Sequence, residues 1–118
     1  MRLRHLALSV SDVERSVRFY MDKIGLAGTV TVEDWGARLR LDDGFTMALI
    51  EGDPLPSDVV DRIHFGCQLP DADCVSKLRA RLRAAGVPEV DWVEEEGYSS
   101  VKVRDPDGYV VECAWDIQ

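Results

Sequence analysis

The amino-acid sequence predicts an α+β fold built from two βαβββ modules. Alternating apolar and polar residues indicate strands, helically spaced apolar residues indicate one helix in each half, and the two halves resemble each other. A chain of 118 residues is long enough for one domain that buries about 65% of its unfolded surface. We therefore expect a single domain over residues 1–118, with module one at 1–52, a linker at 53–60 and module two at 61–118.

The first module begins with a predicted strand at Leu3–Val10, in which apolar and small or polar residues alternate. Ser11 is the predicted helix N-cap, because Glu14 follows three residues later as in a capping box. Apolar residues at helical spacing then lead to Gly25, which is expected to end the helix in a left-handed conformation. Three further strands are predicted, separated by turn residues, at Thr29–Glu33, Ala37–Leu41 and Phe45–Ile50.

The second module repeats this pattern after a segment rich in turn-forming residues. A strand is expected at Arg62–Leu69, followed by a helix that Asp71 or Asp73 caps and that ends at Gly86. The remaining strands are predicted at Glu89–Glu94, Ser99–Arg104 and Tyr109–Trp115.

The two halves can be aligned without a gap over their first strand. The segment His5–Asp12 runs beside His64–Asp71, and Asp43–Phe45 runs beside Asp107–Tyr109 after extra residues that fall in loops. This internal similarity indicates a duplicated supersecondary unit, and each unit needs a partner to bury its sheet.

Composition argues against several classes of function. With 22 acidic and 14 basic residues the net charge is −8, which works against nucleic-acid binding. No apolar run approaches the roughly 20 residues of a membrane span, and the N-terminus lacks the pattern of a signal peptide. The odd number of cysteines, Cys67, Cys74 and Cys113, favours a reducing, cytoplasmic location over a disulfide framework.

Three side chains form a candidate metal site. His5 and His64 are the two histidines of the chain and occupy the same position in the first strand of each module. Both point away from the apolar face of that strand, as does Glu112 in the last strand. A carboxylate in an apolar strand is costly to bury without a cation, and two histidines with one carboxylate are typical ligands of divalent metals. An isolated histidine in a strand is more often structural, but the shared position favours a site.

Three aromatic residues have more than one interpretation, and two cysteines are assigned to the core. Trp35, Trp92 and Tyr98 are predicted in or near loops, where they could line a substrate pocket, pack in the core or form a subunit interface. Cys67 and Cys113 fall on helix-facing sides and are predicted to be small core residues rather than ligands or nucleophiles.

These features together resemble the vicinal oxygen chelate superfamily, which includes glyoxalase I, bleomycin-resistance proteins, fosfomycin-resistance enzymes and extradiol dioxygenases. The resemblance covers nearly the whole chain. Its most specific parts are His5–Asp12, Arg18–Tyr20 with Gly25-Leu26, and Asp105–Glu112. The resemblance implies that the paired modules form an incomplete barrel around a divalent metal (Fe, Mn, Ni or Zn). It implies His5, His64 and Glu112 as ligands, a small-molecule substrate and a homodimer, whose subunits could share the site.

The resemblance supports the superfamily better than any one reaction. The position of a fourth family ligand falls on Ala48, which cannot coordinate, and this weakens an assignment as glyoxalase I. The acidic stretch after Gly86 argues against a phosphonate substrate. Lyase, isomerase and dioxygenase activities stay open, with Glu112 as a candidate catalytic base.

The alternative is a metal-free protein that binds a drug or natural product, as bleomycin-resistance proteins do. The acidic composition favours cationic ligands, on which Trp35, Trp92 and Tyr98 could stack.

Overall fold

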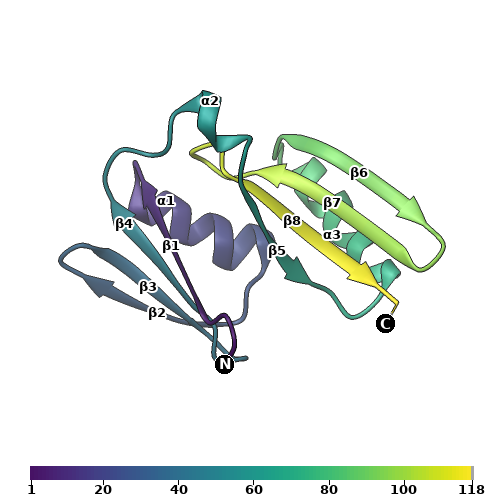
Figure 1. The fold of residues 1–118 in the computed structure, drawn as a ribbon, viewed down its shortest axis with the longest axis horizontal. Coiled ribbons are helices and arrows are strands. Elements are labelled where there is room, and N and C mark those ends of the chain that lie inside the picture. The colour runs from purple at the N-terminus through teal and green to yellow at the C-terminus, as the bar shows by residue number, and fades with distance from the viewer. Residues whose placement is uncertain (118) are drawn as a thin grey trace. The chain divides into compact units, whose positions relative to one another are not determined.

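The chain folds into two units, each built around one four-stranded mixed sheet, which confirms the predicted α+β class. The structure is a computed structural model and describes residues 1–117. Unit 1 is Met1–Leu55 and unit 2 is Pro56–Gln118. Figure 1 shows the order of the elements along the chain. Among the described residues, none of the helices is both long and apolar enough to cross a membrane.

Unit 1 contains four strands and one helical stretch. In chain order the elements are β1 (His5–Val10), α1 (Val13–Arg18), the π-helical turn η1 (Phe19–Ile24), β2 (Gly28–Glu33), β3 (Gly36–Leu41) and β4 (Thr46–Glu51). The strand order is β1-β4-β3-β2, with β1 parallel to β4 and the other pairs antiparallel. Because the helix carries the chain back between β1 and the later strands, the first strand can lie parallel to the last.

Unit 2 has the same topology. Its elements are α2 (Ser57–Val60), β5 (His64–Gln68), α3 (Ala72–Ala84), β6 (Glu89–Glu95), β7 (Tyr98–Arg104) and β8 (Val110–Asp116). The strand order is β5-β8-β7-β6, with β5 parallel to β8. The predicted linker at 53–60 therefore contains one helical turn, because Pro56 accepts backbone hydrogen bonds from Val59 and Val60.

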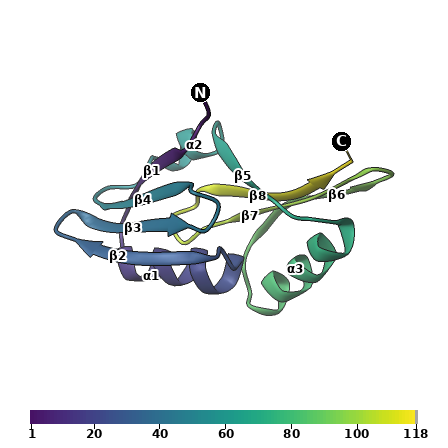
Figure 2. The same cartoon turned by 90° about the horizontal axis from the view of Figure 1, so that it is seen from below.

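Each sheet has one face covered by its own helix and one face without a helix. Figure 2 shows α1 against the sheet of unit 1 and α3 against the sheet of unit 2. The covered faces hold apolar side chains that are at most 8% exposed, among them Leu8, Val10, Leu39, Leu49, Val101, Val103, Val111 and Cys113. Because side chains alternate along a strand, the residues between them lie on what we call the helix-free face.

The two helices that cover the sheets, α1 and α3, each have an aspartate as N-cap. Asp71 accepts a hydrogen bond from the backbone N–H of Cys74 at 2.8 Å, so the sequence identified one of its two candidates correctly. In unit 1 the prediction of Ser11 as N-cap is wrong, because Asp12 accepts from the backbone N–H of Arg15 at 3.0 Å. Ser11 instead accepts from the guanidinium of Arg15. Both residues are good caps, and the chain leaves β1 so that Asp12 is the extended residue before the helix.

The first helix widens before it ends. Gly25 adopts φ 88°, which confirms the predicted left-handed stop, and its N–H donates to the carbonyl of Tyr20. The π-helical spacing of η1, which apolar periodicity did not predict, buries Phe19, Tyr20 and Ile24 together. The rings of Phe19 and Tyr20 pack edge to face with centroids 5.0 Å apart.

Candidate functional site

The helix-free face of unit 2 brings His64 and Glu112 together. His64 begins β5, and Glu112 lies two residues beyond Val110, the residue on β8 that is opposite His64. The two side chains therefore lie diagonally on one face, with His64 Nε2 3.8 Å from Glu112 Oε2. Gly66 lies directly opposite Glu112, where a Cβ atom would be 3.3 Å from the Glu112 carbonyl oxygen. This small residue keeps the space beside the carboxylate open.

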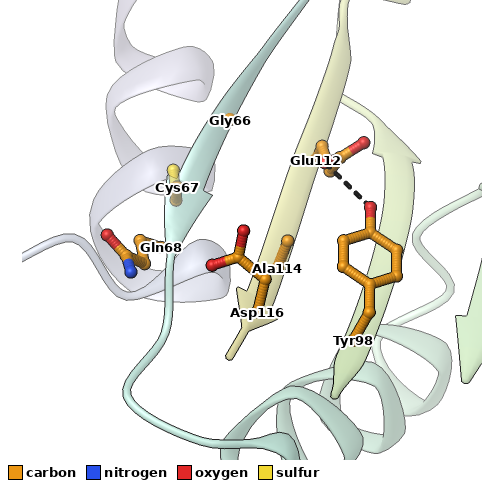
Figure 3. A pocket seen from close by; sticks show the side chains of 7 residues that line it. All are labelled: Gly66, Cys67, Gln68, Tyr98, Glu112, Ala114 and Asp116. Atoms are coloured by element: carbon orange, nitrogen blue, oxygen red, sulfur yellow. Dashed lines mark hydrogen bonds between the residues drawn. The ribbon is translucent and has the colours of Figure 1, made fainter. Parts of the chain in front are cut away.

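Two residues of β7 complete the surroundings of Glu112. The hydroxyl of Tyr98 donates to Glu112 Oε1 at 3.4 Å (Figure 3). The ammonium of Lys102 lies 3.5 Å from Glu112 Oε2, and the two side chains are 29% and 21% exposed. One carboxylate oxygen therefore faces a hydroxyl, and the other faces an imidazole and an ammonium.

The ion pair with Lys102 gives Glu112 a positive partner that the sequence analysis did not include. We expected that a carboxylate in an apolar strand needs a metal to offset the cost of burial, but Lys102 already supplies a positive charge. Sequence reasoning missed Lys102, although a signal was available. The two predicted strands form a hairpin whose register pairs Lys102 with Glu112 directly.

The turn between β7 and β8 fixes that register. The carboxylate of Asp105 is 5% exposed and accepts hydrogen bonds from the backbone N–H groups of Asp107 and Tyr109, each at 2.9 Å. Gly108 supplies φ 91°, a conformation that favours glycine. Because the turn is held by a buried acceptor, the strand pairing that places Lys102 opposite Glu112 is strongly specified.

A cavity of about 270 Å³ opens beside Glu112. Its lining residues all belong to unit 2 and are Gly66, Cys67, Gln68, Tyr98, Glu112, Ala114 and Asp116 (Figure 3). The volume lies just below the roughly 300–1,000 Å³ typical of small-molecule sites. The cavity can therefore admit water or a small ligand group next to the carboxylate.

The pair His64 and Glu112 fits a divalent metal chemically. An imidazole nitrogen and a carboxylate oxygen each bind such ions at about 2.1 Å, which puts two donors of one ion roughly 3–4 Å apart. The observed separation of 3.8 Å lies in that range. Within residues 1–117, however, no group of three or more His, Cys, Asp or Glu side chains is arranged to hold a metal ion.

His5, the third ligand predicted from sequence, belongs to unit 1. It begins β1 on the helix-free face and lies opposite Thr46 of β4, the same relation that His64 has to Val110. The strand register thus confirms the alignment of the two repeats. Ala48 lies at the position in unit 1 that Glu112 holds in unit 2, as the sequence alignment predicted.

The three predicted aromatic residues lie in different surroundings. Tyr98 begins β7 and lines the cavity beside Glu112. Trp35 lies in the turn between β2 and β3, with the guanidinium of Arg38 5.2 Å from its ring. Trp92 lies at the centre of β6 on the helix-covered face, inside the strand predicted at Glu89–Glu94 and not in a loop. The guanidinium of Arg79 from α3 stacks 4.4 Å from its ring, so Trp92 packs a helix onto the sheet.

The two cysteines of the sheet are adjacent on the helix-covered face. Cys67 and Cys113 are paired in register between β5 and β8, and Cys113 is completely buried. A hydrogen bond with Cys67, together with burial, raises the pKa of the Cys113 thiol far above its usual range. Cys113 therefore stays protonated and packs as a small apolar residue, while Cys67 is half-buried and also lines the cavity.

A family model confirms the resemblance inferred from the motifs. The model described as Glyoxalase/Bleomycin resistance protein/Dioxygenase superfamily matches residues 2–113. The chain belongs to this superfamily. Members of one superfamily share a fold but differ in chemistry, so membership alone does not define a reaction.

The relatives of this superfamily member include one curated enzyme and many solved structures. A manganese-dependent 2,3-dihydroxybiphenyl 1,2-dioxygenase from Geobacillus genomosp. 3 is 29% identical over 97% of this chain, which spans only 36% of that enzyme. The structure of a possible glyoxalase from Bacillus cereus is 26% identical, with a TM-score of 0.77 and coverage of 96% of this chain and 97% of that one. A glyoxalase/dioxygenase from Nostoc punctiforme has a TM-score of 0.78 at 20% identity, covering 99% of this chain and 92% of that one, which shows a shared fold.

Proposed function

We propose that this chain is a divalent-metal-dependent enzyme that acts on a small molecule with two adjacent oxygen atoms. The observation that supports the proposal most directly is the distance of 3.8 Å between His64 Nε2 and Oε2 of Glu112, a residue that lines a cavity. The superfamily and the likeness to a manganese-dependent dioxygenase agree with it. Lyase, isomerase and ring-cleaving dioxygenase reactions all fit this description.

In this proposal His64 and Glu112 hold the ion, and His5 supplies the third ligand from the same chain or from a second copy. A bound divalent ion would act as a Lewis acid that stabilises negative charge developing on a substrate oxygen. Tyr98 positions the carboxylate of Glu112 through its hydrogen bond to Oε1. Gly66 leaves room for the substrate, because any side chain there would approach the backbone of β8.

The proposal is tested by metal content and affinity. The parent chain, purified without chelator, is expected to hold about one divalent ion per site, with Mn²⁺ as the first metal to measure. The variants His64→Ala, Glu112→Gln and His5→Ala should each weaken binding by about 100-fold, because ligand removal costs at least as much as loss of an outer-shell partner. Elemental analysis and calorimetric titration measure both quantities.

Asp116→Asn provides a matched control. Asp116 lines the same cavity with a carboxylate but is outside the proposed ligand set. Its substitution should leave metal affinity within a few-fold of the parent. If the parent holds no stoichiometric metal and all variants behave alike, the metal-dependent enzyme is the wrong assignment.

A metal-free binding protein for a drug or natural product is the second candidate. The ion pair between Lys102 and Glu112 favours it, because the carboxylate then has a positive partner without any metal. Tight binding of a cationic aromatic compound by His64→Ala, in the absence of metal, would support this candidate over the enzyme.

A further inference from the structure

We propose that Lys102 competes with the divalent metal for the carboxylate of Glu112, so that the metal binds only by displacing a cation the chain itself provides. This inference rests on the proposed function, because it assigns a further residue to the same site. It concerns the affinity of the site for metal.

The geometry of Glu112 carries the inference. Lys102 Nζ lies 3.5 Å from Oε2, and His64 Nε2 lies 3.8 Å from that same oxygen. The other oxygen, Oε1, accepts from the Tyr98 hydroxyl at 3.4 Å. A metal held between His64 and Glu112 therefore needs the carboxylate oxygen that Lys102 already contacts.

The backbone keeps Lys102 at this position. Lys102 and Glu112 are directly paired across β7 and β8, and the buried Asp105 turn fixes the register of that hairpin. Cβ atoms of directly opposite residues in an antiparallel pair lie about 5 Å apart, so the lysine stem begins beside Glu112 and its ammonium is within reach of the carboxylate.

Two cations beside one carboxylate repel each other. The repulsion is stronger in a partly buried site than in water, and Glu112 and Lys102 are 21% and 29% exposed. Because the lysine stem is flexible, its ammonium can swing toward solvent when metal arrives. Lys102 is therefore expected to weaken metal binding without preventing it.

The decisive experiment measures the Mn²⁺ dissociation constant by calorimetry on the full chain. Lys102→Met retains most of the aliphatic stem and removes the charge, and it should bind Mn²⁺ about tenfold more tightly than the parent. Lys102→Arg retains the charge and should stay near the parent value. Lys77→Met removes a lysine on α3 that pairs with Asp73 and should also leave the affinity unchanged.

Thermal unfolding of the metal-free protein gives a second readout. Lys102→Met leaves Glu112 without its ammonium partner and should lower the Tm before metal is added. Addition of Mn²⁺ should then raise the Tm of this variant more than it raises that of the parent. A residue with a purely structural role would lower the Tm without improving metal affinity.

The outcomes separate this inference from the proposed function. If the parent binds Mn²⁺ and Lys102→Met binds it equally or more weakly, Lys102 is not a competitor, and the metal-dependent assignment stands. If neither protein binds Mn²⁺, Fe²⁺, Ni²⁺ or Zn²⁺, both ideas fail. Metal binding by the variant alone would support competition in its strongest form.

Discussion

The two units share one topology but differ at the position where chemistry is proposed. In unit 2, Glu112 lies between Gly66 and Lys102 in the sheet register. In unit 1 the matched position is Ala48, which lies between Ala7 and Arg38. The same backbone position therefore holds a carboxylate opposite a lysine in unit 2. In unit 1 it holds a methyl group opposite an arginine.

The cations at the matched positions, Arg38 and Lys102, pair with different partners. Arg38 has no carboxylate opposite it, and it pairs with Glu33 on the neighbouring strand at 3.3 Å while its guanidinium lies near Trp35. Lys102 pairs with Glu112 instead. Either unit can accommodate a cation on its helix-free face, so the pairing with a proposed ligand distinguishes unit 2 and does not follow from the fold alone.

The largest difference between the two units is expected in the stability of their cores. Leu49 of β4 and Cys113 of β8 occupy matched positions, and both are completely buried. Leu49→Ala should lower the free energy of unfolding by about 3 kcal/mol, because it removes a large side chain and leaves a cavity. Cys113→Ala removes only a sulfur atom and should cost about 1 kcal/mol. Urea denaturation followed by circular dichroism measures both values.

Equal losses of unfolding free energy in the two variants would contradict this difference between the cores. They would mean that the core of unit 2 depends on Cys113 beyond its volume, for example through its hydrogen bond with Cys67. A Cys67→Ala variant, which removes that bond and leaves the Cys113 side chain in place, distinguishes this case.

Much of the fold could be predicted because the relevant signals are local. Strand parity placed His64 and Glu112 on one face, and Gly25 ended the first helix as its left-handed preference predicts. The alignment of the repeats placed Ala48 where the observed register puts it. Alternation and capping depend on neighbours in sequence, so each can be inferred without knowing the tertiary structure.

The parts that could not be predicted depend on side-chain reach and on packing between elements. Alternation indicates the face of Lys102, but whether its long side chain turns to Glu112 or to solvent is decided by the environment. The sequence left open whether Trp92 lines a pocket, packs in the core or forms an interface, and the contact that decides is the stacking of Arg79 from α3 on its ring. The choice of Asp12 over Ser11 as cap depends on the direction in which the chain leaves β1.

A smaller effect is expected from matched positions in the two helices. Ser16 of α1 and Val75 of α3 correspond in the repeat alignment, and both are completely buried. The hydroxyl of Ser16 has no hydrogen-bond partner among the residues that the structure describes. Ser16→Ala should therefore raise the free energy of unfolding by about 1 kcal/mol, since it removes an unsatisfied buried group.

The same urea titration measures this gain. Val75→Ala is the matched variant in unit 2 and should lower stability, because it removes buried methyl groups. A loss of stability in Ser16→Ala would show that the hydroxyl makes a favourable interaction after all, and the contrast between the helices would disappear.

The smallest effect concerns the helix cap of unit 2 and appears only in acid. The backbone N–H of Cys74, followed by the Cys74 thiol, donates to Asp71 and lowers the pKa of its carboxyl group below 3.8. A carboxyl whose pKa is lower in the folded state stabilises the protein above its unfolded pKa, and this contribution is lost as the pH falls through the folded pKa. Asp71→Asn retains a capping oxygen that does not titrate. The variant should therefore lose less stability than the parent between pH 5 and 2 in urea titrations, and identical losses would mean that the ionised cap of α3 adds nothing that a neutral cap cannot supply.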